Sequence, residues 1–226
     1  MNIFYLQERP FGVGILSLHF PVMLRDDERK FAQDYYSKSV EHRDQHKCGG
    51  YPYADGDLLN QIVRLTQTRS VLEIGTAIGY SAYCFAYCNN VSVVTIDMVE
   101  QHREIAENNW RDLDVANQIE MITGNSQDVL PTLNQNFDIV FFDGFAPNPN
   151  EVNQYCRLVG ESGLLITTNH SWNKSTPEFI QEIENNDLNC VLKADTAFSS
   201  RDQNKVEMCV ELWEKKHETL SESKYI

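Results

Sequence analysis

Two patterns of apolar residues alternate along the chain. Short runs rich in β-branched and aromatic residues, bounded by glycine or polar residues, predict buried strands. Seven such runs lie at residues 71–74, 91–97, 119–122, 137–142, 163–170, 190–192 and 206–213. Between the runs, apolar residues spaced three and four positions apart predict amphipathic helices. These helices begin near residues 57, 81, 99, 149 and 175. Strands that alternate with helices predict an α/β fold around a mostly parallel sheet.

Three segments refine this fold prediction. The run Phe137–Phe142 has one polar residue, as expected of a central parallel strand buried on both faces. The last run, Val206–Trp213, alternates strictly, which predicts an antiparallel strand with two distinct faces. The helix that starts at Pro149 carries an apolar stripe that extends to Val159. We therefore expect the strand after that helix to begin near Gly163.

The stretch from Val71 to Ser81 predicts a strand, a tight turn and the start of a helix. The turn holds Gly75 and Gly79, which allow the backbone to come close to a ligand. The helix that follows offers free N–H groups and the positive end of its dipole. We therefore expect this turn to bind a ligand.

The residues around the turn discriminate between cofactor classes. Dinucleotide folds use G-x-G-x-x-G, whereas this chain has Glu73-x-Gly75-x-x-x-Gly79, so a nicotinamide oxidoreductase does not fit. An acid at the end of the strand repels phosphate but suits a ligand with an ammonium group beside its carboxylate. S-adenosylmethionine has both groups. Asp97 ends the next strand, 24 residues after Glu73, where nucleotide-binding α/β folds place an acid that accepts hydrogen bonds from a ribose.

Composition and charge bear on which other classes of protein the chain could belong to. A chain of 226 residues predicts one main domain, and a net charge of −14 repels nucleic acid. The six cysteines form no C-x-x-C pair, so we expect reduced thiols in a cytoplasmic protein. No segment reaches the roughly 20 apolar residues that a membrane span needs. Residues 1–50 are expected to form an extension, with a helix over Asp26–Tyr36 that serves as a surface element or a lid.

The motif Glu73-Ile74-Gly75-Thr76-x-x-Gly79-Tyr80-Ser81 resembles motif I of the class I S-adenosylmethionine-dependent methyltransferases. It is most similar to the small-molecule O-methyltransferases related to catechol and caffeoyl-CoA enzymes. The resemblance covers residues 50–213 and implies a methyltransferase domain at 51–226. It also implies a Rossmann-like, seven-stranded, mostly parallel sheet with helices on both faces and an antiparallel last strand.

The resemblance implies roles for particular side chains. Glu73 holds the ammonium side of S-adenosylmethionine, directly or through the turn, while Ser81 and nearby amides hold its carboxylate. Asp97 binds the ribose, and Met98 with Ser126 meets the adenine. The implied cofactor-binding set is Tyr51, Glu73, Gly75, Thr76, Gly79, Ser81, Asp97, Met98, Asn125, Ser126 and Asp143.

The resembled enzymes hold a divalent cation with three residues, and this chain departs from that set. Asp143 and Asn169 match two of the ligands, but Thr168 stands where the family has a second Asp. The catalytic Lys of the family is Ala146 here. His170 could join Asp143 and Asn169 as a ligand, although imidazole suits softer metals than magnesium. A metal is therefore an open question.

Several reactions remain open for this site. Methyl transfer to a hydroxyl could proceed without a metal, with Asp143 or His170 as the general base. A neutral amine acceptor would need no proton removed before attack. A cofactor-binding protein without transfer activity would also explain the missing Asp and Lys. The expected partner is a small-molecule acceptor, a homodimer is compatible with the sequence, and no nucleic acid or membrane is expected.

Overall fold

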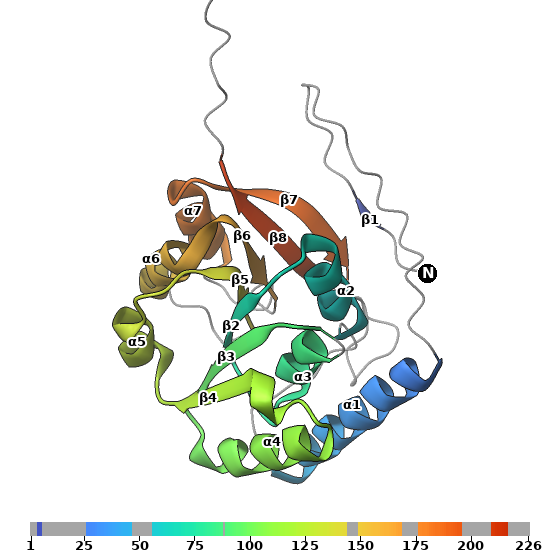
Figure 1. Cartoon of the computed structure of the whole chain (residues 1–226). Coiled ribbons are helices and arrows are strands. Elements are labelled where there is room, and N and C mark those ends of the chain that lie inside the picture. The colour runs from blue at the N-terminus through green and yellow to red at the C-terminus, as the bar shows by residue number, and fades with distance from the viewer. Residues whose placement is uncertain are drawn as a thin grey trace, which may run out of the picture.

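The computed structural model describes residues 4–5, 26–46, 56–87, 89–143, 149–168, 176–195 and 209–216. The strands within these ranges form one eight-stranded sheet in the order β1-β7-β8-β6-β5-β2-β3-β4 (Figure 1). The strands are β1 (Phe4–Tyr5), β2 (Ser70–Ile74), β3 (Ser92–Asp97), β4 (Ile119–Thr123), β5 (Phe137–Phe142), β6 (Val159–Thr167), β7 (Leu188–Asp195) and β8 (Cys209–Lys215).

Helices connect the parallel strands. The α-helices are α1 (Asp26–His46), α2 (Gly56–Thr66), α3 (Tyr80–Ala86), α4 (Glu100–Asp112), α5 (Ser126–Val129), α6 (Pro149–Leu158) and α7 (Thr176–Asn185). Two short 3₁₀ turns, η1 (Ala116–Gln118) and η2 (Leu130–Thr132), follow α4 and α5. None of these described helices is long and apolar enough to cross a lipid bilayer.

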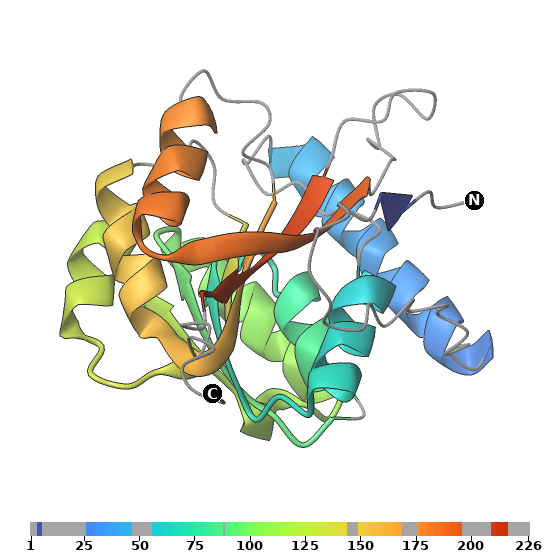
Figure 2. The same cartoon turned by 90° about the horizontal axis from the view of Figure 1, so that it is seen from above.

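The sheet separates two apolar cores, because successive side chains of a strand point to opposite faces. Val71 of β2 packs with side chains of α1, α2, α3 and α4, such as Phe85. Leu72, the next residue, packs on the other face with side chains of α6 and α7, such as Tyr155. The result is a three-layer arrangement with helices on both faces of the sheet (Figure 2).

The strand order fixes where a ligand can bind. Strand β2 pairs in parallel with both β3 and β5, and the chain moves outward from β2 to β4 before it returns to β5. Between β2 and β5 the direction of winding reverses, and open α/β sheets bind ligands beside the carboxyl ends of such strands. These ends carry the turn at Gly75, Asp97 as the last residue of β3, Asp143 after β5 and Thr168 after β6.

The predicted fold class is confirmed. Seven of the strands correspond to the seven predicted runs, and β8 is antiparallel to both of its neighbours, β6 and β7. One boundary was wrong, because Val159 starts β6 by pairing with Phe137 instead of ending the helix. Strand β1 was not predicted and pairs antiparallel with β7. A helix was expected at Asp26–Tyr36, and it extends to His46. The division at residue 50 stays a prediction.

Three cysteine side chains lie in the interior of the described part of the chain. Cys84 and Cys156 are buried, and Cys190 is partly buried. Burial raises the pKa of the Cys156 thiol to about 12, with Glu182 as the second cause. This thiol is therefore protonated at neutral pH and serves as a packing group.

Candidate functional site

The turn between β2 and α3 has an unusual backbone. Gly75, Ala77 and Gly79 have positive φ angles of 105°, 46° and 91°. Positive φ costs little for glycine but strains alanine, and such strain persists where surrounding contacts enforce it. Gly79 has a second constraint, because a Cβ atom there would lie 2.5 Å from Nε1 of Trp110. Trp110 also donates from Nε1 to the Gly79 carbonyl at 2.9 Å. Packing against α4 therefore holds the turn in shape.

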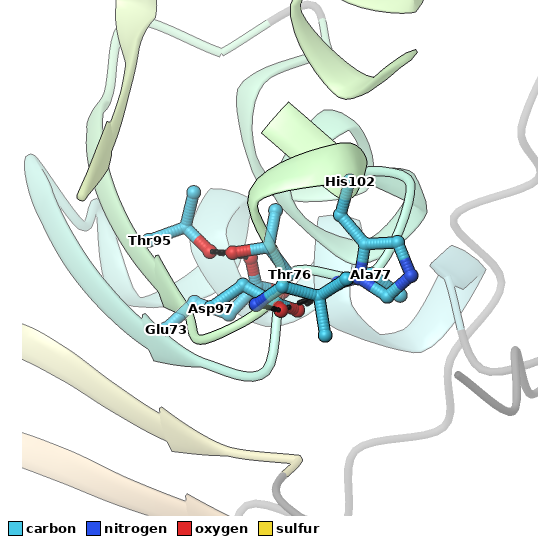
Figure 3. A network of polar contacts seen from close by, with 7 residues as sticks. Glu73, Thr76, Ala77, Thr95, Asp97 and His102 are labelled. Carbon is cyan, nitrogen blue, oxygen red and sulfur yellow. Dashed lines mark hydrogen bonds and ion pairs between the residues drawn. The ribbon is translucent and has the colours of Figure 1, made fainter. Parts of the chain in front are cut away.

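Beneath the turn lies a buried network of carboxylate and hydroxyl groups (Figure 3). Glu73 is 0% exposed, and its register opposite Thr95 places both side chains on the same face of the sheet. Thr95 donates from Oγ1 to Oε2 of Glu73 at 2.5 Å, and Ser81 donates to Oε1. Because the single Thr95 proton is used, the Thr76 hydroxyl donates to Thr95 at 2.5 Å. Glu73 thus ties β3 and α3 to the turn.

The cofactor contacts predicted for Glu73, Thr76 and Ser81 stay predictions, and the network shows what these side chains bind within the protein. Glu73 is buried, and its two oxygens accept hydrogen bonds from Ser81 and Thr95. The Ser81 hydroxyl gives its proton to Glu73, and the Thr76 hydroxyl lies buried against Thr95. The predicted role of Glu73 at the ammonium side of the cofactor, directly or through the turn, stays a prediction. So does a contact from backbone amides near Ser81.

Asp97 lies at the rim of the same turn, at the end of β3. Its Oδ2 accepts a hydrogen bond from the Ala77 amide at 2.7 Å, and Oδ1 accepts one from the Val99 amide at 2.8 Å. His102 of α4 also lies close, with Nδ1 3.3 Å from Oδ1 (Figure 3). Each oxygen of a carboxylate has a further lone pair. Asp97 can therefore close the turn and still accept a hydroxyl of a ligand.

The residues predicted to meet an adenine ring follow β3 and β4 at the same edge of the sheet. Met98 is 71% exposed, which is unusual for a large apolar side chain and leaves its face open to a ligand. Asn125 caps α5 by accepting from the Gln127 amide at 3.0 Å. Ser126 donates to Oε1 of Glu151 at 2.8 Å, so its hydroxyl proton is not available for a ring nitrogen. The contact of Ser126 with an adenine ring stays a prediction.

The ends of β5 and β6 bring Asp143 and Thr168 together. The Thr168 hydroxyl donates to Oδ1 of Asp143 at 2.7 Å, and the Thr168 amide donates to the Phe142 carbonyl at 3.0 Å. The residue that replaces the expected second acid thus touches the first one. Among the described residues, no cluster of three His, Cys, Asp or Glu side chains could hold a metal ion. Tyr51, Ala146, Asn169 and His170 lie outside the described residues.

Several residues that shape the site were not predicted. Thr95 had a signal, since it is the only polar residue between Val93 and Ile96 in a strand that is otherwise apolar at those positions. Glu151 of α6 had none, because an acid in the first turn of a helix is common. It is buried and accepts from both Ser126 and Tyr155, each at 2.8 Å. His102 and Trp110 lie on one face of α4, where helical spacing alone does not identify their partners.

A row of imidazoles runs from α1 to this rim. The His42 and His46 ring centroids are 4.5 Å apart, and those of His42 and His102 are 5.6 Å apart. Burial, followed by the nearby His46 and His102, lowers the pKa of His42 from its usual value. The row therefore favours a neutral His42 in the folded protein.

We expect the free energy of unfolding to fall on the acid side because of His42. Its pKa is lower in the folded state, so the unfolded chain binds more protons, and stability is lost as pH falls through about 6.5. Urea unfolding of the natural protein and of His42→Asn at several pH values between 7.5 and 5 measures this. The slope with pH should be shallower in the variant. Equal slopes would contradict the assignment.

Comparison with known sequences identifies related proteins. A family model described as O-methyltransferase matches residues 33–212. The catechol O-methyltransferase of Niastella koreensis is 28% identical over 121 residues, which are 51% of this chain and 55% of that protein. That of Mycobacterium tuberculosis is 32% identical over 118 residues, which are 51% of this chain and 54% of that protein. The chain thus spans about half the length of these curated relatives.

Solved structures share the fold at lower identity. The O-methyltransferase TomG from Streptomyces achromogenes, involved in tomaymycin synthesis and solved in complex with SAM, has a TM-score of 0.68 and 21% identity, over 86% of this chain and 93% of that one. An O-methyltransferase from Bacillus cereus in complex with SAH has a TM-score of 0.65 and 20% identity, over 86% and 94%. Likeness at this level of identity shows the fold alone.

Proposed function

This chain belongs to the O-methyltransferase family, and from that premise we propose that it transfers a methyl group from S-adenosylmethionine to a hydroxyl group of a small molecule. The observation that carries the proposal is the position of Asp97. This acid ends β3 at the carboxyl edge of the sheet, directly beside the strained turn after β2. A carboxylate at that place can accept from the two hydroxyls of a ribose.

The remaining cofactor contacts follow from the same edge of the sheet. The backbone of the Gly75–Gly79 turn and the start of α3 would meet the methionine end, with Glu73 acting through the turn. Met98 would pack on the adenine with its exposed side chain. Near Ser126, backbone amides rather than the hydroxyl would meet the ring edge. The names of related structures, which include SAM and SAH, support this choice of cofactor.

The described residues at the ends of β5 and β6, Asp143 and Thr168, do not by themselves fit a site for a hard divalent cation. Such an ion prefers several carboxylate oxygens, and here one carboxylate, Asp143, accepts a hydrogen bond from a neutral hydroxyl, Thr168. The Thr168 hydroxyl already occupies one of the two Asp143 oxygens, Oδ1. We therefore derive no step through a metal.

For this reaction the protein must mainly hold the acceptor oxygen next to the methyl group and remove the proton of the acceptor hydroxyl. An acceptor oxygen attacks the methyl group in line with the sulfonium, and holding the two together supplies most of the effect. The hydroxyl must also lose its proton, and Asp143 lies at the carboxyl edge of β5, next to the turn. We assign Asp143 as the general base among the described residues. His170 is the second candidate.

A binding and transfer experiment with a chelator arm tests this function. Calorimetry should show that S-adenosylmethionine binds. A labelled methyl group should then pass to a member of a phenol panel, with a rate in EDTA within about twofold of the rate in magnesium, a ratio worth about 0.4 kcal/mol of barrier. Absence of cofactor binding would overturn the proposal. A rate that collapses in EDTA would contradict the metal-free reading.

The same panel should include primary amines and a sample without any acceptor. Transfer to amines alone would reassign the acceptor class, because a neutral amine attacks without a base. Tight cofactor binding with no transfer to any member would indicate a binding protein in place of an enzyme. We test for a binding protein because Thr168, which donates to Asp143, stands where a second acid was expected.

A further inference from the structure

Helix α1 packs against the body of the protein along one stripe of side chains. Tyr35, Ser39 and Arg43 follow each other at intervals of one helical turn, and all three are buried. The Tyr35 ring meets two tyrosines of α3, with centroid distances of 5.8 Å to Tyr80 and 5.4 Å to Tyr83. This part of α1 is therefore an integral element of the core on the α3 side of the sheet.

The hydroxyl of Tyr35 reaches past this packing to the turn itself. It donates to the Ile78 carbonyl at 2.6 Å, from a side chain that is 2% exposed. Ile78 lies between Ala77 and Gly79, within the segment of positive φ angles. Burial raises the pKa of Tyr35 well above its usual value, so the phenol stays a hydrogen-bond donor over the whole physiological range. A phenylalanine ring could make the same packing contacts. The effect of the Tyr35 hydroxyl on the turn can therefore be separated from the packing of the ring.

Helix α4 supports the same side of the turn. Asn109 donates from Nδ2 to the Ile78 carbonyl at 3.2 Å, and Trp110 donates from Nε1 to the Gly79 carbonyl at 2.9 Å. Three side chains from two helices thus hold two consecutive carbonyls. On the other side of the turn, the Ala77 amide donates to Asp97. The conformation of the turn is therefore set from both sides.

We propose that Tyr35 is a positioning residue for the cofactor, which holds the Gly75–Gly79 turn in its binding conformation through the Ile78 carbonyl. This inference rests on the proposed function, since it takes the turn as the cofactor cradle. It assigns α1 a fixed place beneath the site, in contrast to the lid suggested by its polar sequence. The chain segment before residue 50 thus contributes to cofactor affinity without touching the cofactor.

The effect acts through the population of the binding-competent turn. Positive φ at Ala77 is strained, so the turn relaxes into other conformations once a supporting hydrogen bond is lost. The apparent dissociation constant rises as the competent fraction falls. One hydrogen bond corresponds to a change of about 2- to 10-fold in that fraction. The chemical step is unaffected, because a turn with cofactor bound is again in the competent conformation.

The test uses Tyr35→Phe, which removes the hydroxyl and keeps the ring. We expect the dissociation constant and KM for S-adenosylmethionine to rise about 2- to 10-fold, while kcat and the KM of the acceptor stay within about twofold. Hydrogen exchange of amides 75–81 in the free protein should speed up by a similar factor, while that of β5 and β6 should not change. Ser39→Ala is the matched control, because it removes a buried hydroxyl of the same helix that bonds only to the Tyr35 carbonyl. It should change none of these quantities.

A double variant covers the case in which Tyr35→Phe destabilises the whole protein. Tyr35→Phe and Asn109→Ala remove both side-chain donors of one carbonyl, so together they should weaken binding by more than the product of their separate effects. Unchanged exchange at 75–81 together with unchanged cofactor affinity would overturn the proposal. A uniform rise in exchange across the sheet, with a matching fall of kcat, would also overturn it. The exchange arm reads out the turn even if the natural protein binds no S-adenosylmethionine, so failure of the proposed function is recognised separately.

Discussion

Asp97→Asn is expected to lower the affinity for S-adenosylmethionine about 10- to 100-fold, because hydrogen bonds to a charged group contribute about 1.5–3 kcal/mol. The carboxylate accepts from the Ala77 and Val99 amides with different oxygens. An asparagine has only one acceptor oxygen, so its NH₂ group must face one of these two donors. The turn then loses a support at the point where the ribose is expected to bind. Calorimetry and the KM for the cofactor measure the loss.

Asp138→Asn is the matched control for this prediction. Asp138 also accepts two backbone N–H groups, from Arg69 at 2.7 Å and Ser70 at 3.0 Å, both at Oδ2, but it lies at the amino end of β5, on the opposite edge of the sheet. The variant removes the charge of a carboxylate that binds the backbone, while its amide oxygen can still accept both N–H groups, so cofactor affinity should not change. Equal cofactor affinity in the two variants would contradict a role for Asp97 in binding.

Gly79→Ala is expected to reduce the free energy of unfolding by about 2–5 kcal/mol. The φ angle of 91° is left-handed, where a Cβ atom costs about 1–2 kcal/mol. The new methyl group would also lie 2.5 Å from Nε1 and 2.6 Å from Cε2 of the buried Trp110, and overpacking of this kind costs about 1–3 kcal/mol. Urea denaturation measures the change. Because the turn and α4 must separate, cofactor binding should be lost as well.

Gly124→Ala controls for the added methyl group. Gly124 also follows a parallel strand at this edge, but the nearest atom to its new Cβ would be one methyl group of Val129, at 2.9 Å. That side chain can shift, so the loss of stability should be clearly smaller than at Gly79. Similar losses at both positions would show that the contact with Trp110 is not the cause.

The fold could be predicted because its signals are local and repeated. The mostly apolar run Phe137–Phe142 lies in the middle of the sheet between β2 and β6, as its composition indicated. The alternation before Trp213 identified the antiparallel strand. Val159 was misplaced because its spacing continues the helical stripe, while its state is decided by pairing with Phe137. Local spacing contains no information about a partner more than 20 residues away.

The site was predictable in its position but less so in its contacts. Glycine spacing and two acids at strand ends located the turn and placed Asp97 beside it. The direction of each hydroxyl was not predictable, because Ser81 and Ser126 each have one proton, and which acid takes it depends on the folded arrangement. The support from Tyr35 also lacked a signal, since an aromatic residue in a polar helix has no fixed partner in the sequence.

The position of β8 between β6 and β7 affects how the protein folds during its synthesis. Strand β7 is made before β8, and among the described strands it reaches β6 and the parallel strands only through β8, while β1 pairs with its other edge. Until β8 arrives, β6 and β7 expose unpaired edges, which are sites of aggregation. The nascent chain should therefore depend on chaperones most strongly in the interval between synthesis of these two segments.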